Sequence, residues 1–208
     1  MSIVKLNNNG VKNATAFGSI TGLGSMTFIK KLTASSSSTL SFVDGASSVV
    51  LDNTYKEYLF TFNNIHPATD NVTFNFNVSI DGGSNYNVAK TTTNFRAYHY
   101  EDGSGAAVDY RTTADLAQGT GSQILTEGLG NANDECVVGV LRLFNPSSTT
   151  FVKHFMANSH AMVDDGGLQN TNFFVAGYCN TTTAIDGVQF KFDSGNIDSG
   201  TFKLYGVS

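Results

Sequence analysis

Four histidines are the side chains best suited to metal binding or acid–base chemistry: His66, His99, His154 and His160. His154 and His160 are six residues apart, which fits neither a helical zinc site nor a strand pair two residues apart. His99 stands between two tyrosines, where packing or hydrogen bonding is the commoner role. His66 precedes Pro67, which favours an extended backbone, so we expect a corner between strands with the imidazole bonded to backbone groups.

Serine nucleophiles and paired carboxylates are the next candidates for chemistry. A serine on an exposed strand-to-helix turn would appear as G-x-S-x-G, which the chain lacks. A glycosidase needs two facing carboxylates, and nothing singles out such a pair among the four glutamates. The acidic turns at 81–85 and 164–167 lack the spacing of a calcium loop, although a surface cation there stays open. We therefore predict no catalytic, cofactor-binding or metal-binding residues, and a protein that is not an enzyme.

The charge pattern argues against nucleic acid and membrane as partners. The net charge is −5, only three arginines occur, and Lys30-Lys31 is the one basic cluster, so a phosphate-binding patch is not expected. No apolar run approaches the ~18 residues of a membrane span, and the N-terminus lacks the apolar core of a signal peptide. These features favour synthesis in a reducing cytoplasm. Cys136 and Cys179 lie in strand-like runs, and buried thiols are favoured over a disulfide, which stays open.

Almost every periodic segment of the chain alternates between apolar and polar residues, which is typical of strands with one buried face. Turn sequences rich in Gly, Asn and Asp separate these segments, and no helical stripe of three turns is present. The sequence predicts an all-β fold, an antiparallel sandwich resembling a jelly roll. The expected strands are 26–33, 38–44, 55–64, 71–80, 93–100, 122–129, 136–145, 149–158, 172–180, 187–193 and 200–207.

The segment 71–80, NVTFNFNVSI, shows the alternation best. It predicts a core-facing row and a row that faces water or a neighbouring subunit. The core-facing row is Val72, Phe74, Phe76, Val78 and Ile80, and the wet row is Asn71, Thr73, Asn75 and Asn77.

The N-terminal region differs from the rest of the chain. It is rich in Asn and Gly, and its scattered apolar residues cannot form a core of their own: Ile3, Val4, Leu6, Val11, Phe17, Ile20 and Leu23. We interpret residues 1–33 as an extended docking arm and residues 34–208 as the β-sandwich domain. The serine run within 34–42 is expected to be a short linker between them.

One stretch of the domain is a candidate contact surface. Tyr98, Tyr100 and Tyr110, with Arg96 and Asp102, could form an amphipathic surface that grips carbohydrate. The alternative is that these tyrosines pack their rings and expose only their hydroxyl groups.

Several segments carry a resemblance to a known group of proteins: NIHPATDNVTFNFNVSIDGGSNYNVAKTTTNFRAYH, DLAQGTG, LFNPSSTTFVKHF, AGYCNTTTAIDGVQFKF and SGNIDSGTFKLYGV. Together they resemble small virion proteins of tailed phages of marine bacteria, described as tail-fibre or structural proteins. The opening VKLNNNGVKNATAF resembles a segment that precedes differing β domains in such phages. The resemblance covers roughly residues 3–14 and 60–207, and it supplies no catalytic residue.

The resemblance implies a non-enzymatic protein of a virion surface, made in the host cytoplasm and docked by its arm. The expected partners are other virion proteins of the capsid or tail, and a homo-oligomer with a trimer favoured. The role would be host attachment by a tail fibre or decoration of the capsid. The alternative is a module that binds or degrades a host-envelope polysaccharide, with a surface glycan as partner.

Overall fold

The structure is a computed structural model that describes residues 26–208. Within this range the chain forms strands and no helix. Aromatic and β-branched residues in alternation with Asn, Thr and Ser suit a pleated surface, which explains the preference for strands. The strands are β1 Met26–Ser37, β2 Leu40–Val43, β3 Glu57–Pro67, β4 Val72–Ser79, β5 Lys90–Tyr100, β6 Ala106–Tyr110, β7 Gln123–Leu129, β8 Val137–Phe144, β9 Lys153–Asp164, β10 Leu168–Cys179, β11 Gly187–Phe192 and β12 Ile197–Val207.

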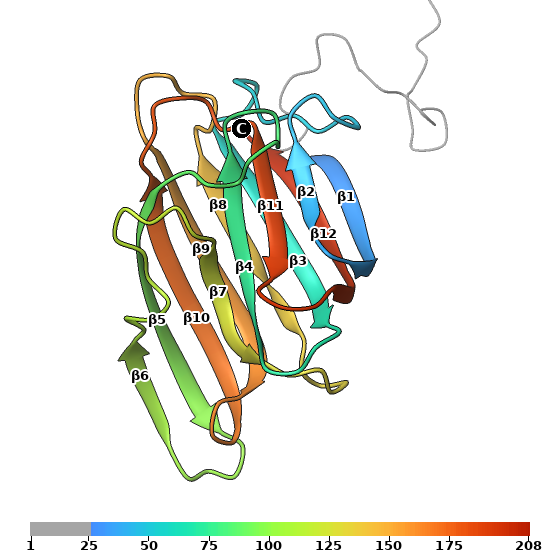
Figure 1. Ribbon diagram of the computed structural model, residues 1–208, viewed down its shortest axis with the longest axis vertical. Coiled ribbons are helices and arrows are strands. Elements are labelled where there is room, and N and C mark those ends of the chain that lie inside the picture. Colours follow the sequence, from blue (N-terminus) through green and yellow to red (C-terminus); the bar gives the residue numbers. More distant parts are fainter. Residues whose placement is uncertain (1–25) are drawn as a thin grey trace, which may run out of the picture.

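The strands form two antiparallel sheets, as the predicted all-β class requires. The larger sheet has eight strands in the order β1-β12-β3-β8-β9-β10-β5-β6, and the smaller has four in the order β2-β11-β4-β7. Figure 1 shows the smaller sheet lying across one face of the larger sheet. β5 and β6, at one end of the larger sheet, reach beyond the edge of the smaller sheet. We call β9, β10, β5 and β6 the four-strand end, and we call the face of the larger sheet that points away from the smaller sheet the outer face.

Buried side chains from both sheets meet between them in one core. Its centre is aromatic: the ring of Phe74 lies 5.3 Å from that of Phe62, 6.0 Å from that of Phe190 and 6.1 Å from that of Phe202, centroid to centroid. Such clusters bury large apolar areas and add favourable edge and offset contacts between rings. This aromatic centre joins β3 and β12 of the larger sheet to β4 and β11 of the smaller one.

Towards the four-strand end, the space between the sheets becomes polar. Thr92 and Gln123 are buried and joined by a 2.6 Å hydrogen bond, and buried Thr126 and Ser159 lie 3.1 Å apart, oxygen to oxygen. Buried polar groups are tolerated when their hydrogen bonds are made, so this layer specifies how the strands align.

Eleven expected strands are present with shifted ends, but one strand was missed. β6 is short, exposed along most of its length and lies at the edge of the larger sheet, so its sequence carries little alternation. The expected linker at 34–42 is wrong, because the serine run completes β1 and leads directly into β2. Residues 26–33 pair with β12 and belong to the larger sheet, although we had assigned them to the arm.

The predicted faces of β4 need correction. Phe74, Phe76 and Val78 are buried as expected, but Asn75 and Asn77 are also only 4% exposed. Asn77 donates hydrogen bonds to the backbone carbonyls of Tyr86 and Thr120, so loop segments cover the side of the strand that we expected to be wet. Ile80 lies beyond the end of β4 and is 37% exposed, so it does not face the core.

Candidate functional site

The outer face carries most of the exposed apolar side chains. Register places Tyr110, Phe95 and Phe174 side by side on β6, β5 and β10, so aromatic groups form a row across the four-strand end. Of the nine large apolar residues that are exposed within 26–208, seven lie on this face: Met26, Phe28, Phe95, Val108, Tyr110, Met156 and Leu168. Five of the seven lie on β9, β10, β5 and β6, so the exposed apolar residues concentrate at the four-strand end, as expected of an interaction surface rather than of scattered solvent exposure.

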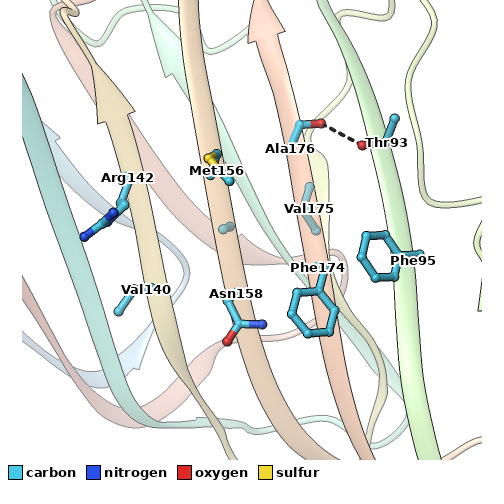
Figure 2. Close-up of a pocket in the computed structure, with 10 residues that line it drawn as sticks. Thr93, Phe95, Val140, Arg142, Met156, Asn158, Phe174, Val175 and Ala176 are labelled. Carbon is cyan, nitrogen blue, oxygen red and sulfur yellow. Dashed lines mark hydrogen bonds between the residues drawn. The ribbon is translucent and has the colours of Figure 1, made fainter. Parts of the chain in front are cut away.

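A shallow groove of about 300 Å³ crosses the outer face over β8, β9, β10 and β5 (Figure 2). The rings of Phe95 and Phe174 stack along one side with centroids 4.9 Å apart. Met156 is 56% exposed and lies on β9 nearby. The charge at the other side belongs to Arg142, which pairs with Glu57 at 3.2 Å, nitrogen to oxygen. The groove therefore offers apolar contact and little net charge.

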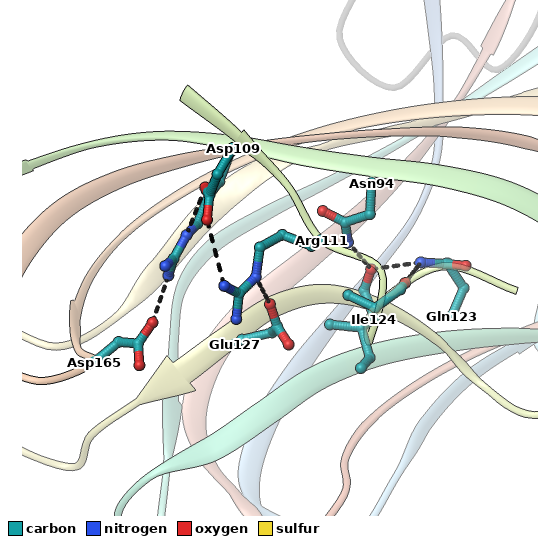
Figure 3. Close-up of polar contacts among 9 residues, drawn as sticks. Asn94, Asp109, Arg111, Gln123, Ile124, Glu127 and Asp165 are labelled. Atoms are coloured by element: carbon teal, nitrogen blue, oxygen red, sulfur yellow. Dashed lines mark hydrogen bonds and ion pairs between the residues drawn. The ribbon is translucent and has the colours of Figure 1, made fainter. Parts of the chain in front are cut away.

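A chain of ion pairs braces the inner side of the four-strand end. Arg96 on β5 donates to Asp109 on β6 at 3.0 Å and to Asp165 in the β9–β10 turn at 2.8 Å. Arg111 donates to Glu127 on β7 at 2.8 Å and to Asp109 at 3.4 Å. Figure 3 shows Asp109 in contact with Arg111, with Glu127 and Asp165 on either side. These contacts fix the edge strand and the turn against the smaller sheet, which keeps the outer face in one shape.

The predicted carbohydrate-contact residues do not form one surface. Arg96 is 5% exposed and its guanidinium is held by two carboxylates, so it is not available at the surface. Its Cζ lies 4.8 Å from the ring centroid of half-buried Tyr98, which in turn meets Tyr100 edge-on at 5.6 Å. Tyr110 lies on the outer face, on the other side of the sheet, and donates a hydrogen bond to Asp115 that raises the pKa of its phenol.

Only Tyr100 and Asp102 of that set reach a shared cleft. The β5–β6 and β9–β10 turns enclose a space of about 670 Å³ lined by Tyr100, Glu101, Asp102, Ser104, Gly166, Gly167 and Leu168. Asp102 is exposed, and hydrogen bonds from Ser104 lower the pKa of its carboxyl.

His66 and the two cysteines have the surroundings of structural residues. The His66 Nε2 lies 3.1 Å from the carbonyl oxygen of Ala132, which confirms the expected bond to the backbone, although His66 is within β3 rather than at a corner. Neither Cys136 nor Cys179 is in a disulfide, and Cys179 is a buried thiol as expected, whereas Cys136 is only half-buried. No three His, Cys, Asp or Glu side chains within residues 26–208 are grouped to hold a metal ion.

The outer face was missed as a site, although the sequence contains a signal for it. The run NFFVAGYC in β10 is apolar at consecutive positions, with Phe173 buried and Phe174 towards the outer face. Strands that are apolar on both faces are covered on both faces, so this run pointed to a second contact surface. The predicted docking residues, from Ile3 to Leu23, lie outside the described part of the chain.

Comparison of the chain with known protein families, with curated proteins and with solved structures found no match. In residues 26–208 no helix is long and apolar enough to cross a membrane. Fold and site together define an all-β protein of two antiparallel sheets whose exposed large apolar residues gather on the outer face, mostly at the four-strand end.

Proposed function

We propose that this chain is a non-enzymatic structural protein of a tailed-phage virion. It is a surface appendage, either of the tail-fibre and receptor-binding type or of the head-decoration type. Residues 1–25 act as the docking arm onto capsid or tail proteins, ahead of the edge strand β1. The observation that carries this function is the apolar outer face, since assembly through broad surfaces is what a structural subunit requires.

The order of the strands supports a jelly-roll sandwich. The eight strands β1, β2, β3, β4, β7, β8, β11 and β12 correspond in chain order to the letters B to I of a jelly roll. The larger sheet then contains B-I-D-G and the smaller sheet is C-H-E-F, the two-sheet arrangement of that fold. Jelly rolls occur in viral capsid proteins and in lectins, so the fold favours these classes by analogy only.

The remaining four strands are the four-strand end, which enters as two hairpins inserted between E and F and between G and H. These insertions carry Phe95, Val108, Tyr110, Met156 and Leu168, five of the seven exposed apolar residues of the outer face. The added strands thus supply the contact surface. We infer that the outer face packs against sister subunits in a homo-oligomer, with a trimer favoured, because an apolar face without strong charge suits a copy of itself.

Sedimentation of full-length protein tests this assembly. Phe95→Lys places a charge in the groove and should shift the wild-type oligomer to monomer. Phe151→Lys is the matched control, because Phe151 is 68% exposed but lies in the β8–β9 loop, and it should leave the oligomer intact. A wild-type protein that stays monomeric at micromolar concentration would contradict the role of the outer face.

Placement on the particle has its own test. Immunogold labelling of intact virions with antibody against residues 34–208 should decorate either the head or the tail. A protein that lacks residues 1–25 should remain folded but fail to join particles. Particles without label, or normal incorporation of the shortened protein, would contradict the virion role or the docking arm respectively.

The cleft between the two turns supports a second candidate, a module that binds host-envelope polysaccharide. Tyr100 offers part of an aromatic ring, and Glu101 and Asp102 offer acceptors for sugar hydroxyl groups. Binding to a glycan array that is lost in Asp102→Ala would favour it. An array without any bound glycan, and no release of reducing ends, would remove it.

A further inference from the structure

A buried lysine faces a buried asparagine where the two sheets join. Lys90 opens β5 and is 0% exposed, and Asn77 near the end of β4 is 4% exposed. The Lys90 Nζ lies 2.6 Å from the Asn77 Oδ1 and 2.7 Å from the carbonyl oxygen of Val88. An amine and a carboxamide are therefore held in contact in a site without access to bulk water.

The surroundings of Lys90 make its neutral amine easier to reach than that of an ordinary lysine, with the ammonium form still predominant at pH 7. A neutral amine has two N–H donors, which the Asn77 and Val88 oxygens accept, and a lone pair that stays available. Burial lowers the pKa of Lys90 from its ordinary 10.5 to about 8, and the Cys179 thiol opposes this shift. The titratable groups that face it are Cys179 on β10 and, beyond it in the same row, Lys153 on β9. A desolvated neutral lysine is a nucleophile.

The amide of Asn77 is oriented and polarised. Its Nδ2 donates to the carbonyls of Tyr86 and Thr120, and its Oδ1 accepts from Val78 N–H and Lys90 Nζ. These four hydrogen bonds fix the orientation of the amide group. The Val78 N–H donates to the Asn77 Oδ1 at 2.9 Å, where negative charge develops if a nucleophile adds to Cγ. Fixed proximity of this kind replaces a collision between two molecules and speeds reactions by large factors.

We propose that Lys90 and Asn77 join in an intramolecular isopeptide bond. The lone pair of Nζ attacks the Asn77 Cγ and forms the new C–N bond, while the carbonyl electrons move to Oδ1. The Cγ–Nδ2 bond then breaks, and a proton passes from Nζ to the departing nitrogen, which leaves as ammonia. Amine and carboxamide give a secondary amide and ammonia, so the step needs no oxidant or other reactant.

The bond would join the two sheets covalently. Asn77 lies in the smaller sheet, and Lys90 begins the first strand of the four-strand end in the larger sheet. The link therefore secures the inserted hairpin that carries Phe95, in a protein without a disulfide. This inference is independent of the virion function, because the chemistry depends only on the two side chains.

Intact-mass spectrometry of the wild-type protein tests the bond directly. The folded chain should weigh less than its sequence by one ammonia, and peptide mapping should find the Lys90 peptide joined to the Asn77 peptide. Ring closure at Asn9-Gly10 would also release ammonia, but it joins no peptides, so the joined pair is the deciding observation. A folded chain with full mass and no joined peptide, even after long incubation at about pH 9, overturns the proposal.

Variants and pH refine the test. Lys153→Met removes a buried lysine whose Nζ contacts only the carbonyls of Thr181 and Thr183, so it should keep the bond, whereas Lys90→Met should abolish it. Protein can be isolated unfolded in urea before the bond has formed and then refolded. The bond should then form roughly tenfold faster at about pH 9 than at about pH 7, because only the neutral amine reacts. A joined peptide that persists in Lys90→Met would assign the bond to another lysine and overturn the proposal.

Discussion

Replacing Phe74 with alanine gives the sharpest test of the core. The ring of Phe74 is 0% exposed and meets the rings of Phe62, Phe190, Phe192 and Phe202 at centroid distances of 5.3, 6.0, 5.6 and 6.1 Å. Burial of a phenylalanine is lost on truncation and a cavity remains, which costs about 3–5 kcal/mol. Four ring neighbours hold the cavity open and lose their aromatic contacts, so we expect the upper half of that range.

Urea unfolding of Phe74→Ala and the wild type measures this loss at one fixed protein concentration, because an oligomer's stability depends on concentration. Phe151→Ala is the matched control: its ring is 68% exposed, so the free energy of unfolding should change by less than about 0.5 kcal/mol. A loss below about 1 kcal/mol for Phe74→Ala would mean that the opposite face of β4 packs against the core, and the assigned packing would be wrong.

Three other substitutions have defined outcomes. Burial raises the pKa of Tyr58 from 10.0 to about 12. The neutral phenol therefore makes its full contribution to stability below about pH 10, and this contribution declines as the pH rises towards 12. Unfolding measured across this range should show that the free energy of unfolding of Tyr58→Phe falls by ~2 kcal/mol less than that of the wild type. Arg96→Met removes the partner of Asp165 and one of the two arginine partners of Asp109, so it should cost ~1 kcal/mol in urea unfolding, and an unchanged midpoint would show that the ion pairs are unimportant. Gly139→Ala adds a Cβ 2.6 Å from the ring of Phe62 and against the Asn158 carbonyl, so a loss of at least ~2 kcal/mol is expected, and wild-type stability would contradict that packing.

Strand positions were predictable because alternation is local. A residue's side of a pleated strand follows from its place in the sequence, so segments such as 187–193 matched β11 almost residue for residue. β6 escaped because an edge strand has few buried positions to reveal it. The faces of β4 were only half correct, since alternation cannot show that Asn75 is buried or that loops cover Asn77.

The candidate sites depended more strongly on long-range contacts. Tyr98 and Tyr110 are close in sequence, but the turn that joins β5 to β6 places them on opposite faces of one sheet. Phe95 and Phe174 are far apart in sequence and stack only because β5 and β10 are neighbours. The docking residues of the arm remain a prediction.

The sequence by itself determined the all-β class, most strand positions and the buried thiol of Cys179, because these follow from periodicity, composition and the chemistry of single residues. Only the tertiary structure decided that the inserted hairpins extend one sheet, that their exposed apolar residues share an outer face, and that Lys90 meets Asn77. The physical reason is that strand order and register arise from pairing between distant segments, which no local pattern encodes.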